Sequence, residues 1–167
     1  MNQPPHPKLF DSLIIAVFTM SLASVAGAQN FSFPAEGRFI LPPSLGAEVL
    51  KQCSRLAPTK ISKFWQPSAS DVEQLELALP AFLIERVKSG KEVPSKGSPY
   101  HRQYVGFSEN GERFIYGNFF PADTVKEMSL NESTRPVLVC DGGSAFWGVV
   151  YRVSTKSFEE PQFNGQG

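Results

Sequence analysis

Cys53 and Cys140 are the only cysteines in this chain of 167 residues, and they lie 87 positions apart (140 − 53). A pair of cysteines in an exported chain favours a disulfide bond. Such a bond would join the first third of the protein to its last third. In the entropic model, closing a loop of this length stabilises a fold by about 4–5 kcal/mol. Two buried free thiols are one alternative, and a nucleophilic Cys140 with His101 as its base is another.

Residues 1–28 have the three parts of a secretory signal peptide. A polar start contains Lys8, residues 13–25 are apolar, and small residues occupy positions 26–28. The apolar run is shorter than the roughly 20 residues that a membrane span needs. We therefore expect cleavage after Ala28, a periplasmic or secreted protein, and no stable membrane span afterwards. An uncleaved N-terminal anchor is the alternative.

Cleavage would leave 139 residues (167 − 28), which is enough for one domain with a real core. The whole chain carries 16 basic and 16 acidic residues, so no basic excess indicates a nucleic-acid partner. Nor does the charge suggest an acidic substrate or an anionic membrane. We expect residues 29–43 to form an extended lead-in rich in Phe and Pro, and residues 44–167 to form a single domain.

Apolar spacing predicts a short first helix, capped by Ser44 and extending to about Leu56. Cys53 would then lie on its buried face. A second helix is predicted to begin near Ser70, which stands three residues before Glu73 as in a capping box.

Pro80 predicts a kink in this second helix, or its division into two, because proline removes a helical hydrogen bond. The helical pattern ends before Ser89.

Asn110-Gly111 predicts a two-residue hairpin turn, because both residues tolerate positive φ angles. This turn fixes a register that places the inner residues on one face of the sheet. The expected pairs are Glu109 with Glu112, Phe107 with Phe114, and Val105 with Tyr116.

Further strands are expected at residues 136–140, 145–153 and 158–163, with a turn at 141–143 and partial helical character near 125–128. Helices followed by an antiparallel β-meander of about five strands indicate an α+β domain, with the helices covering one sheet face. A cystatin-like or NTF2-like curl is compatible with this pattern.

Candidate catalytic groups are few. His101 is the only histidine left after leader removal, and no Cys-X-X-Cys or His-X-X-X-His spacing indicates a metal site. A carboxylate site could draw on Asp141, Glu159 or Glu160, yet Asp141 is better explained as a turn cap and the glutamates as a solvated edge. No set of residues supplies a nucleophile, a base and an orienting group. We predict neither a cofactor nor a metal.

Aromatic residues offer a second kind of site. One interpretation is a sheet covered on both sides by the helices and the lead-in. The other is an exposed aromatic surface for a partner. The residues of that predicted surface are Trp147, Tyr151, Asp141, Phe146 and Tyr104.

The segment Cys140-Asp141-Gly142-Gly143, followed by Phe146-Trp147-Gly148-Val149 and Phe163-Asn164-Gly165, resembles the C-terminal part of a set of small exported proteobacterial proteins. The resemblance covers roughly residues 60–165. It implies a bacterial and periplasmic setting, and it implies no activity.

The sequence therefore predicts a non-enzymatic binding or inhibitor-like module with an unknown protein or small-molecule ligand in the cell envelope. A small hydrolase using Asp141 and His101 is one alternative. A structural envelope protein, oligomeric through its last edge strand, is another.

Overall fold

The computed structural model describes residues 1, 31, 33–95, 99–127 and 131–166. The predicted leader lies almost wholly outside these residues. Within the described ranges, no helix combines the length and the apolar character needed to cross a membrane.

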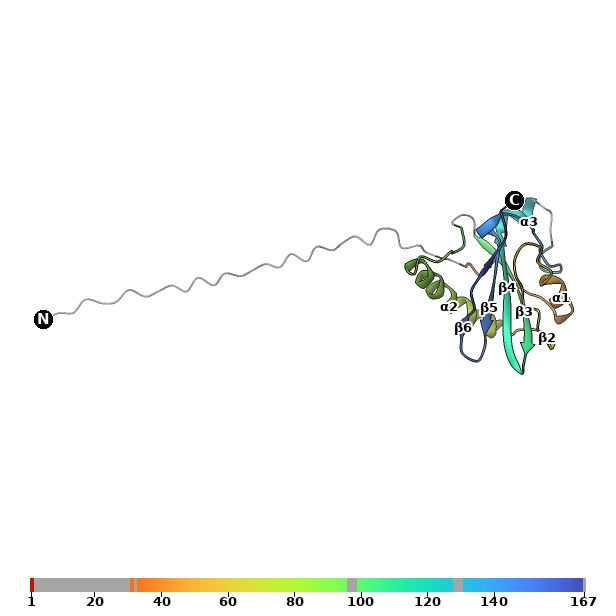
Figure 1. Ribbon diagram of the computed structural model, residues 1–167, viewed down its shortest axis with the longest axis horizontal. Coiled ribbons are helices and arrows are strands. Elements are labelled where there is room, and N and C mark those ends of the chain that lie inside the picture. Colours follow the sequence, from red (N-terminus) through yellow and green to blue (C-terminus); the bar gives the residue numbers. More distant parts are fainter. Residues whose placement is uncertain (2–30, 32, 96–98, 128–130, 167) are drawn as a thin grey trace.

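A mixed sheet of seven strands forms the centre of the described structure (Figure 1). The strand order is β1-β3-β4-β5-β6; β2 also pairs with β3, and β7 also pairs with β5. β1 runs parallel to β3, while every other pair is antiparallel. The strands are β1 (Arg38–Ile40), β2 (Lys63–Trp65), β3 (Tyr100–Glu109), β4 (Glu112–Pro121), β5 (Trp147–Arg152), β6 (Ser157–Phe158) and β7 (Gln162–Phe163).

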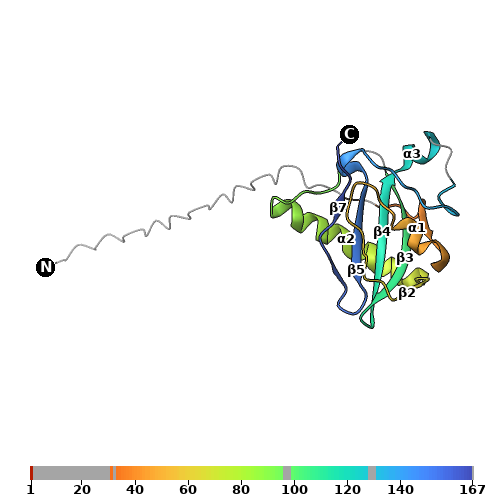
Figure 2. The ribbon, with the colours of Figure 1, turned by 45° about the vertical axis from the view of Figure 1, so that its right-hand side comes forward.

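Helices lie against both faces of this sheet, as Figure 2 also shows, so the expectation that they cover one face is wrong. The long helix α2 packs its apolar residues against one face, and α1 packs against the other. The helical elements are a 3-10 turn (Pro43–Leu45), α1 (Gly46–Val49), α2 (Ala69–Lys88), α3 (Ala122–Glu127) and a second 3-10 turn (Gly143–Ala145). Helices together with this mixed sheet make the fold α+β.

The β3–β4 hairpin confirms the register predicted from Asn110-Gly111. Asn110 has φ 50° and Gly111 has φ 83°, as this turn requires. Glu109 faces Glu112 across the strands. Phe107 faces Phe114 and Val105 faces Tyr116, also as predicted. The inner residues Val105, Phe107, Phe114 and Tyr116 share one buried cluster with Val49 of α1.

Helix α2 differs from its prediction at its start and at its proline. Ser68 is the N-cap, and its reciprocal partner is Asp71, so the capping box lies two residues before the predicted one. Pro80 lies inside one continuous helix. Packing of the apolar face on the sheet compensates for the hydrogen bond that proline removes. The helix ends before Ser89, as predicted.

Of the two predicted elements around the cysteines, the first helix is shorter than predicted and the strand at 136–140 is absent. The first helix ends at Val49, so Cys53 lies in an exposed loop and not on a buried helical face. Residues 136–140 form no strand, and Cys140 is also exposed. The last edge strand is present as two short pieces, β6 and β7, separated by residues 159–161 with Pro161 among them.

The lead-in is part of the domain. Its residues 38–40 supply β1, and Phe33 packs with the rings of Phe119 and Trp147 in the core.

Candidate functional site

The predicted aromatic surface lies mostly inside the protein. Trp147 and Tyr104 are fully buried, and Tyr151 is 2% exposed. Helix α2 covers all three through its leucines, within the same hydrophobic cluster. Phe146 is half-buried in a separate small cluster, and Asp141 is exposed at its turn. These five residues therefore do not form one exposed surface.

His101 contacts a different carboxylate from the one that the hydrolase alternative needs. Its Nδ1 lies 3.1 Å from Oε1 of Glu132. The imidazole packs edge-on against Phe39 and Phe120. The backbone carbonyl of Asp141 accepts a hydrogen bond from Asn164. The structure thus brings His101 to Glu132, while the backbone of Asp141 is held by Asn164.

The two cysteines form a disulfide. Their sulfurs are 2.03 Å apart and their Cα atoms 5.1 Å apart. Because both residues are exposed, the bond joins two surface segments: the loop after α1, and the segment before the turn at 141–143.

Arg55, two residues beyond Cys53, is a buried cation whose acceptors among the described residues are all neutral. It is 9% exposed. Its Nε donates to the Tyr116 hydroxyl at 3.3 Å and its Nη1 to Oδ1 of Asn164 at 2.9 Å. Its Nη2 donates to Oδ1 of Asn118. Burial raises the pKa of Tyr116, and this effect is larger than the lowering caused by the positive charge of Arg55. The phenol therefore stays protonated in this contact.

The acceptors of Arg55 fix the neighbouring backbone. Nδ2 of Asn164 donates to the carbonyls of Val139 and Asp141 at 2.6 and 3.0 Å. Nδ2 of Asn118 donates to the carbonyl of Val137 at 2.9 Å. The segment 137–141 therefore forms no strand because side-chain amides, rather than a ladder, satisfy its carbonyls.

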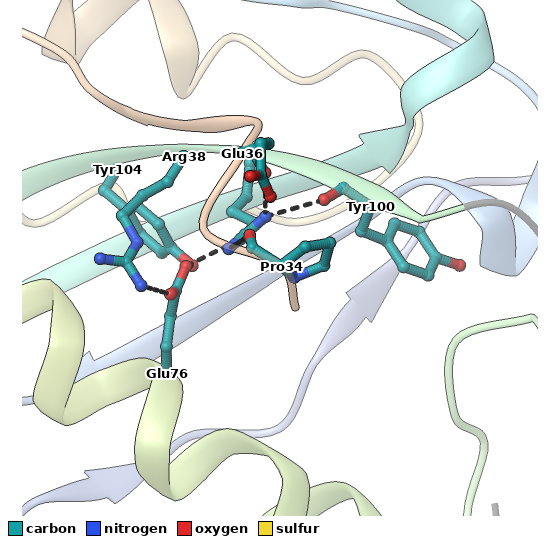
Figure 3. A network of polar contacts seen from close by, with 7 residues as sticks. Pro34, Glu36, Arg38, Glu76, Tyr100 and Tyr104 are labelled. Atoms are coloured by element: carbon teal, nitrogen blue, oxygen red, sulfur yellow. Dashed lines mark hydrogen bonds and ion pairs between the residues drawn. The ribbon is translucent and has the colours of Figure 1, made fainter. Parts of the chain in front are cut away.

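A second buried network holds the lead-in onto α2 and β3 (Figure 3). Glu76 of α2 accepts from Nε of Arg102 at 2.8 Å, from the Tyr104 hydroxyl at 2.9 Å, and from Nη2 of Arg38. Arg102 is fully buried and also donates to the carbonyls of Pro34 and Glu36. Three donors converge on the Glu76 carboxylate, so its lone pairs are engaged and it is poorly placed to act as a base.

A groove of about 200 Å³ opens on the sheet face opposite α2. We call it the rim-acid groove. Residues 56–58 form one wall, and the segment between β6 and β7 forms the other. Its floor comes from β3, β4 and β5. The residues that line it include Leu56, Phe107, Glu109, Tyr116, Gly148, Val150 and Glu159.

In the floor of the rim-acid groove, the Tyr116 ring packs directly against a glycine of β5. A Cβ on Gly148 would lie 2.4 Å from the Tyr116 hydroxyl. Leu56, which the sequence places on a buried helical face, is 76% exposed at the wall. The groove therefore has an exposed apolar side chain at its wall, while the aromatic and aliphatic side chains of its floor are 8% exposed or less.

The charged side chains that line the groove are all acidic. Glu109, Glu159 and Glu160 line it, and no basic side chain does so within the described structure. Glu160 is engaged by Lys91 and Arg86, whose hydrogen bonds lower its pKa. Among the residues that the structure describes, Glu109 and Glu159 make no ion pair. Two carboxylates are thus available beside apolar surface.

A second hollow lies at the hairpin end, where Lys63 and Arg113 flank Trp65. The Arg113 guanidinium lies 3.6 Å from the centre of the Trp65 ring. Gly106 touches that ring, because a Cβ there would come within 2.4 Å of it. Arg113 and Gly106 thus both contact the Trp65 ring, and these contacts hold β2 against β3.

Sequence reasoning missed the rim-acid groove because its parts come from five separate segments of the chain. Glu159 was interpreted as a solvated edge and Leu56 as a buried helical residue. The one local signal is Gly148, a small residue inside an otherwise bulky strand, which marks a close approach or a cavity.

No protein-family model, curated protein or solved structure matches this chain. The resemblance to exported proteobacterial proteins stays a prediction, and function is argued from the chemistry of the groove alone.

Proposed function

We propose that this protein is an exported, non-enzymatic binding module whose ligand carries a cationic group on an apolar stem and lies in the rim-acid groove. The observation that carries the proposal is the pair of carboxylates Glu109 and Glu159, which line the groove with the exposed Leu56 and make no ion pair with any residue that the structure describes. A cation there would gain attraction from both, and its stem would cover Val150 and Leu56.

The size of the groove supports a small group rather than a whole folded surface. A volume of about 200 Å³ is below the usual range of drug-sized sites, roughly 300–1,000 Å³. A lysine or arginine side chain, or a short alkylamine, has suitable dimensions and charge. In the inhibitor-like version of the proposal, the groove holds such a side chain of a partner protein in the cell envelope.

Export is the second part of the proposal. Its support is the leader pattern of residues 1–28 and the pairing of Cys53 with Cys140. A periplasmic setting follows from the resemblance described above. A cystatin-like or NTF2-like curl is also part of the proposal, because the sequence pattern has helices first and antiparallel strands afterwards.

Binding of hexylamine, hexanol and hexanoate tests the ligand class, because the three probes share a stem and differ in charge. Two-dimensional NMR of the labelled protein should show hexylamine shifting the amides of Gly148 and Val150, with much weaker shifts from the other two. Shifts of equal size with hexanoate would contradict the proposal.

Variants locate the site. Glu159→Gln and Glu109→Gln should each weaken hexylamine binding by up to about fivefold, since an exposed ion pair contributes about 1 kcal/mol at most. Leu56→Ala should weaken it as well. Glu85→Gln and Leu77→Ala on α2 are matched controls, because Leu77 is as exposed as Leu56, at 76%. Equal losses in the controls would overturn the assignment to the groove.

A further inference from the structure

The outer face of α2 carries an apolar stripe flanked by opposite charges. Its residues recur every three or four positions and so lie on one side of the helix, facing away from the sheet. Leu77 is 76% exposed and Ile84 is 38% exposed. We call this set the outer stripe; it consists of Glu73, Leu77, Ala81, Ile84 and Lys88.

The outer stripe is complementary to itself when two copies run in opposite directions. Residues 77 and 84 are centred on the same point of the helix as residues 73 and 88, because the residue numbers of both pairs sum to 161. A twofold axis through that point exchanges the two members of each pair. An antiparallel pairing about that midpoint places Leu77 on Ile84 of the other copy. The small Ala81 stands beside the midpoint, where two helices approach most closely.

Charge selects this direction over the other. In the antiparallel pairing, Glu73 of each copy meets Lys88 of the other. A parallel pairing would place Glu73 beside Glu73 and Lys88 beside Lys88. We propose that a second copy of this chain packs antiparallel on the outer stripe and forms a twofold-symmetric dimer.

Neighbouring charges limit the strength of the contact. Nζ of Lys88 already lies 3.6 Å from Oε2 of Glu85 in its own chain, and both side chains are exposed. The hydrogen bond to Glu76 and, to a much smaller extent, the charge of Glu73 raise the pKa of Arg38, so Glu73 already interacts with a cation of its own chain. Exposed pairs of this kind set orientation more than affinity.

The expected dimer is therefore weak. Helix α2 has 20 residues, which corresponds to about 30 Å. Two such helices in contact bury less than the roughly 1,200–2,000 Å² of a standard stable interface. Association should be seen at concentrations of about 10 µM to 1 mM, in the range of transient complexes. This proposal does not depend on the rim-acid groove.

Sedimentation velocity of the purified protein across that concentration range tests the dimer. The sedimentation coefficient should rise with concentration from monomer to dimer. Leu77→Glu should weaken association by about tenfold or more, because it buries two carboxylates in the contact. Leu56→Glu, at an equally exposed position on the other sheet face, is the matched control and should leave association unchanged.

Charge reversal tests the direction. Glu73→Lys and Lys88→Glu should each weaken self-association severalfold, since each places like charges together twice. An equimolar mixture of the two variants should recover association, because each chain then meets its opposite charge in the other.

Three outcomes would overturn the proposal: a monomer throughout the range, equal losses in the Leu56→Glu control, or a mixture no stronger than its components. Circular dichroism melts of each variant show that its fold is retained.

Discussion

Two buried arginines of this protein have different kinds of hydrogen-bond partner. On the α2 side, Arg102 is fully buried but meets the carboxylate of Glu76 at 2.8 Å. On the other side, Arg55 is nearly as buried and meets only a phenol and two amides. A buried charge without a counter-ion depends on well-formed hydrogen bonds, so the neutral acceptors of Arg55 have to be held rigidly.

Arg55→Met tests this dependence. The variant leaves the amide oxygens of Asn118 and Asn164 without their donor, so we expect the free energy of unfolding to fall by about 2–4 kcal/mol. Urea denaturation measures the change. Arg135→Met is the matched control, because Arg135 is exposed, and it should change stability by about 0.5 kcal/mol or less. A similar small change in both variants would show that the Arg55 network adds little.

Ionisation of Tyr104 should lower the free energy of unfolding at alkaline pH. Burial, with the charge of Glu76 next, raises the pKa of this phenol well above its ordinary value of 10.0. Above about pH 10 the unfolded chain releases the phenol proton while the folded chain keeps it. Stability is therefore full below pH 10 and falls as the pH rises through the folded-state pKa.

The Tyr104→Phe variant isolates this contribution. It loses the hydrogen bond to Glu76, so below pH 10 it should be less stable than the parent protein. Its loss of stability above pH 10 should nevertheless be shallower than that of the parent protein, by up to about 1.4 kcal/mol per pH unit, which corresponds to one proton. Urea denaturation from pH 8 to 11 gives both slopes. Identical slopes would mean that Tyr104 ionises equally easily in both states.

Elements whose signal is local were predictable from the sequence. The hairpin follows from Asn110-Gly111, whose φ angles suit one turn type and thereby fix the register of β3 and β4. The helix expected through Cys53 was wrong because Arg55 is drawn into a buried network with Asn118 and Asn164. Partners 63 and 109 positions away leave no trace in a periodic pattern.

Two glycine substitutions separate backbone strain from packing in the sheet. Gly111 has φ +83°, and a methyl group added there would meet nothing within 4 Å, so Gly111→Ala should cost about 1 kcal/mol from conformation alone. Gly106→Ala should cost about 1–3 kcal/mol, because the new methyl group would overlap the Trp65 ring.

Fluorescence distinguishes these two causes. Gly106→Ala should displace Trp65 from Arg113 and from its 2.9 Å hydrogen bond to the Phe107 carbonyl, and so change the tryptophan emission of the folded protein. Gly111→Ala should leave the emission unchanged. An unchanged spectrum in Gly106→Ala would show that β2 adapts to the extra methyl group without moving its ring.

At the scale of the whole molecule, the candidate site was the least predictable feature. An exposed aromatic surface around Trp147 and Tyr151 was one of two interpretations, and α2 covers both residues, as the other interpretation of a covered sheet requires. Apolar residues on both sides of a strand indicate that both faces are covered, and the pattern does not show which cover is incomplete. The rim-acid groove exists where residues 56–58 and the β6–β7 segment leave the floor open. That gap is a property of the assembled fold.

The disulfide and the Arg55 network hold the same part of the molecule. Cys53 and Arg55 both attach the loop after α1 to the segment around residues 137–141, one by a covalent bond and the other through Asn118 and Asn164. Because this loop continues into the wall of the rim-acid groove at Leu56, the two attachments together position the wall.

Replacing both cysteines by alanine measures how much the disulfide contributes to the free energy of unfolding. Loop closure over 87 residues predicts a loss of about 4–5 kcal/mol in the free energy of unfolding. The folded double variant should keep its groove, because Arg55 still anchors the loop. Combining it with Arg55→Met should cost more than the sum of the separate losses, since neither attachment then remains. Urea denaturation of all four proteins gives this coupling energy directly. Strict additivity would show that the two attachments act on independent parts of the fold.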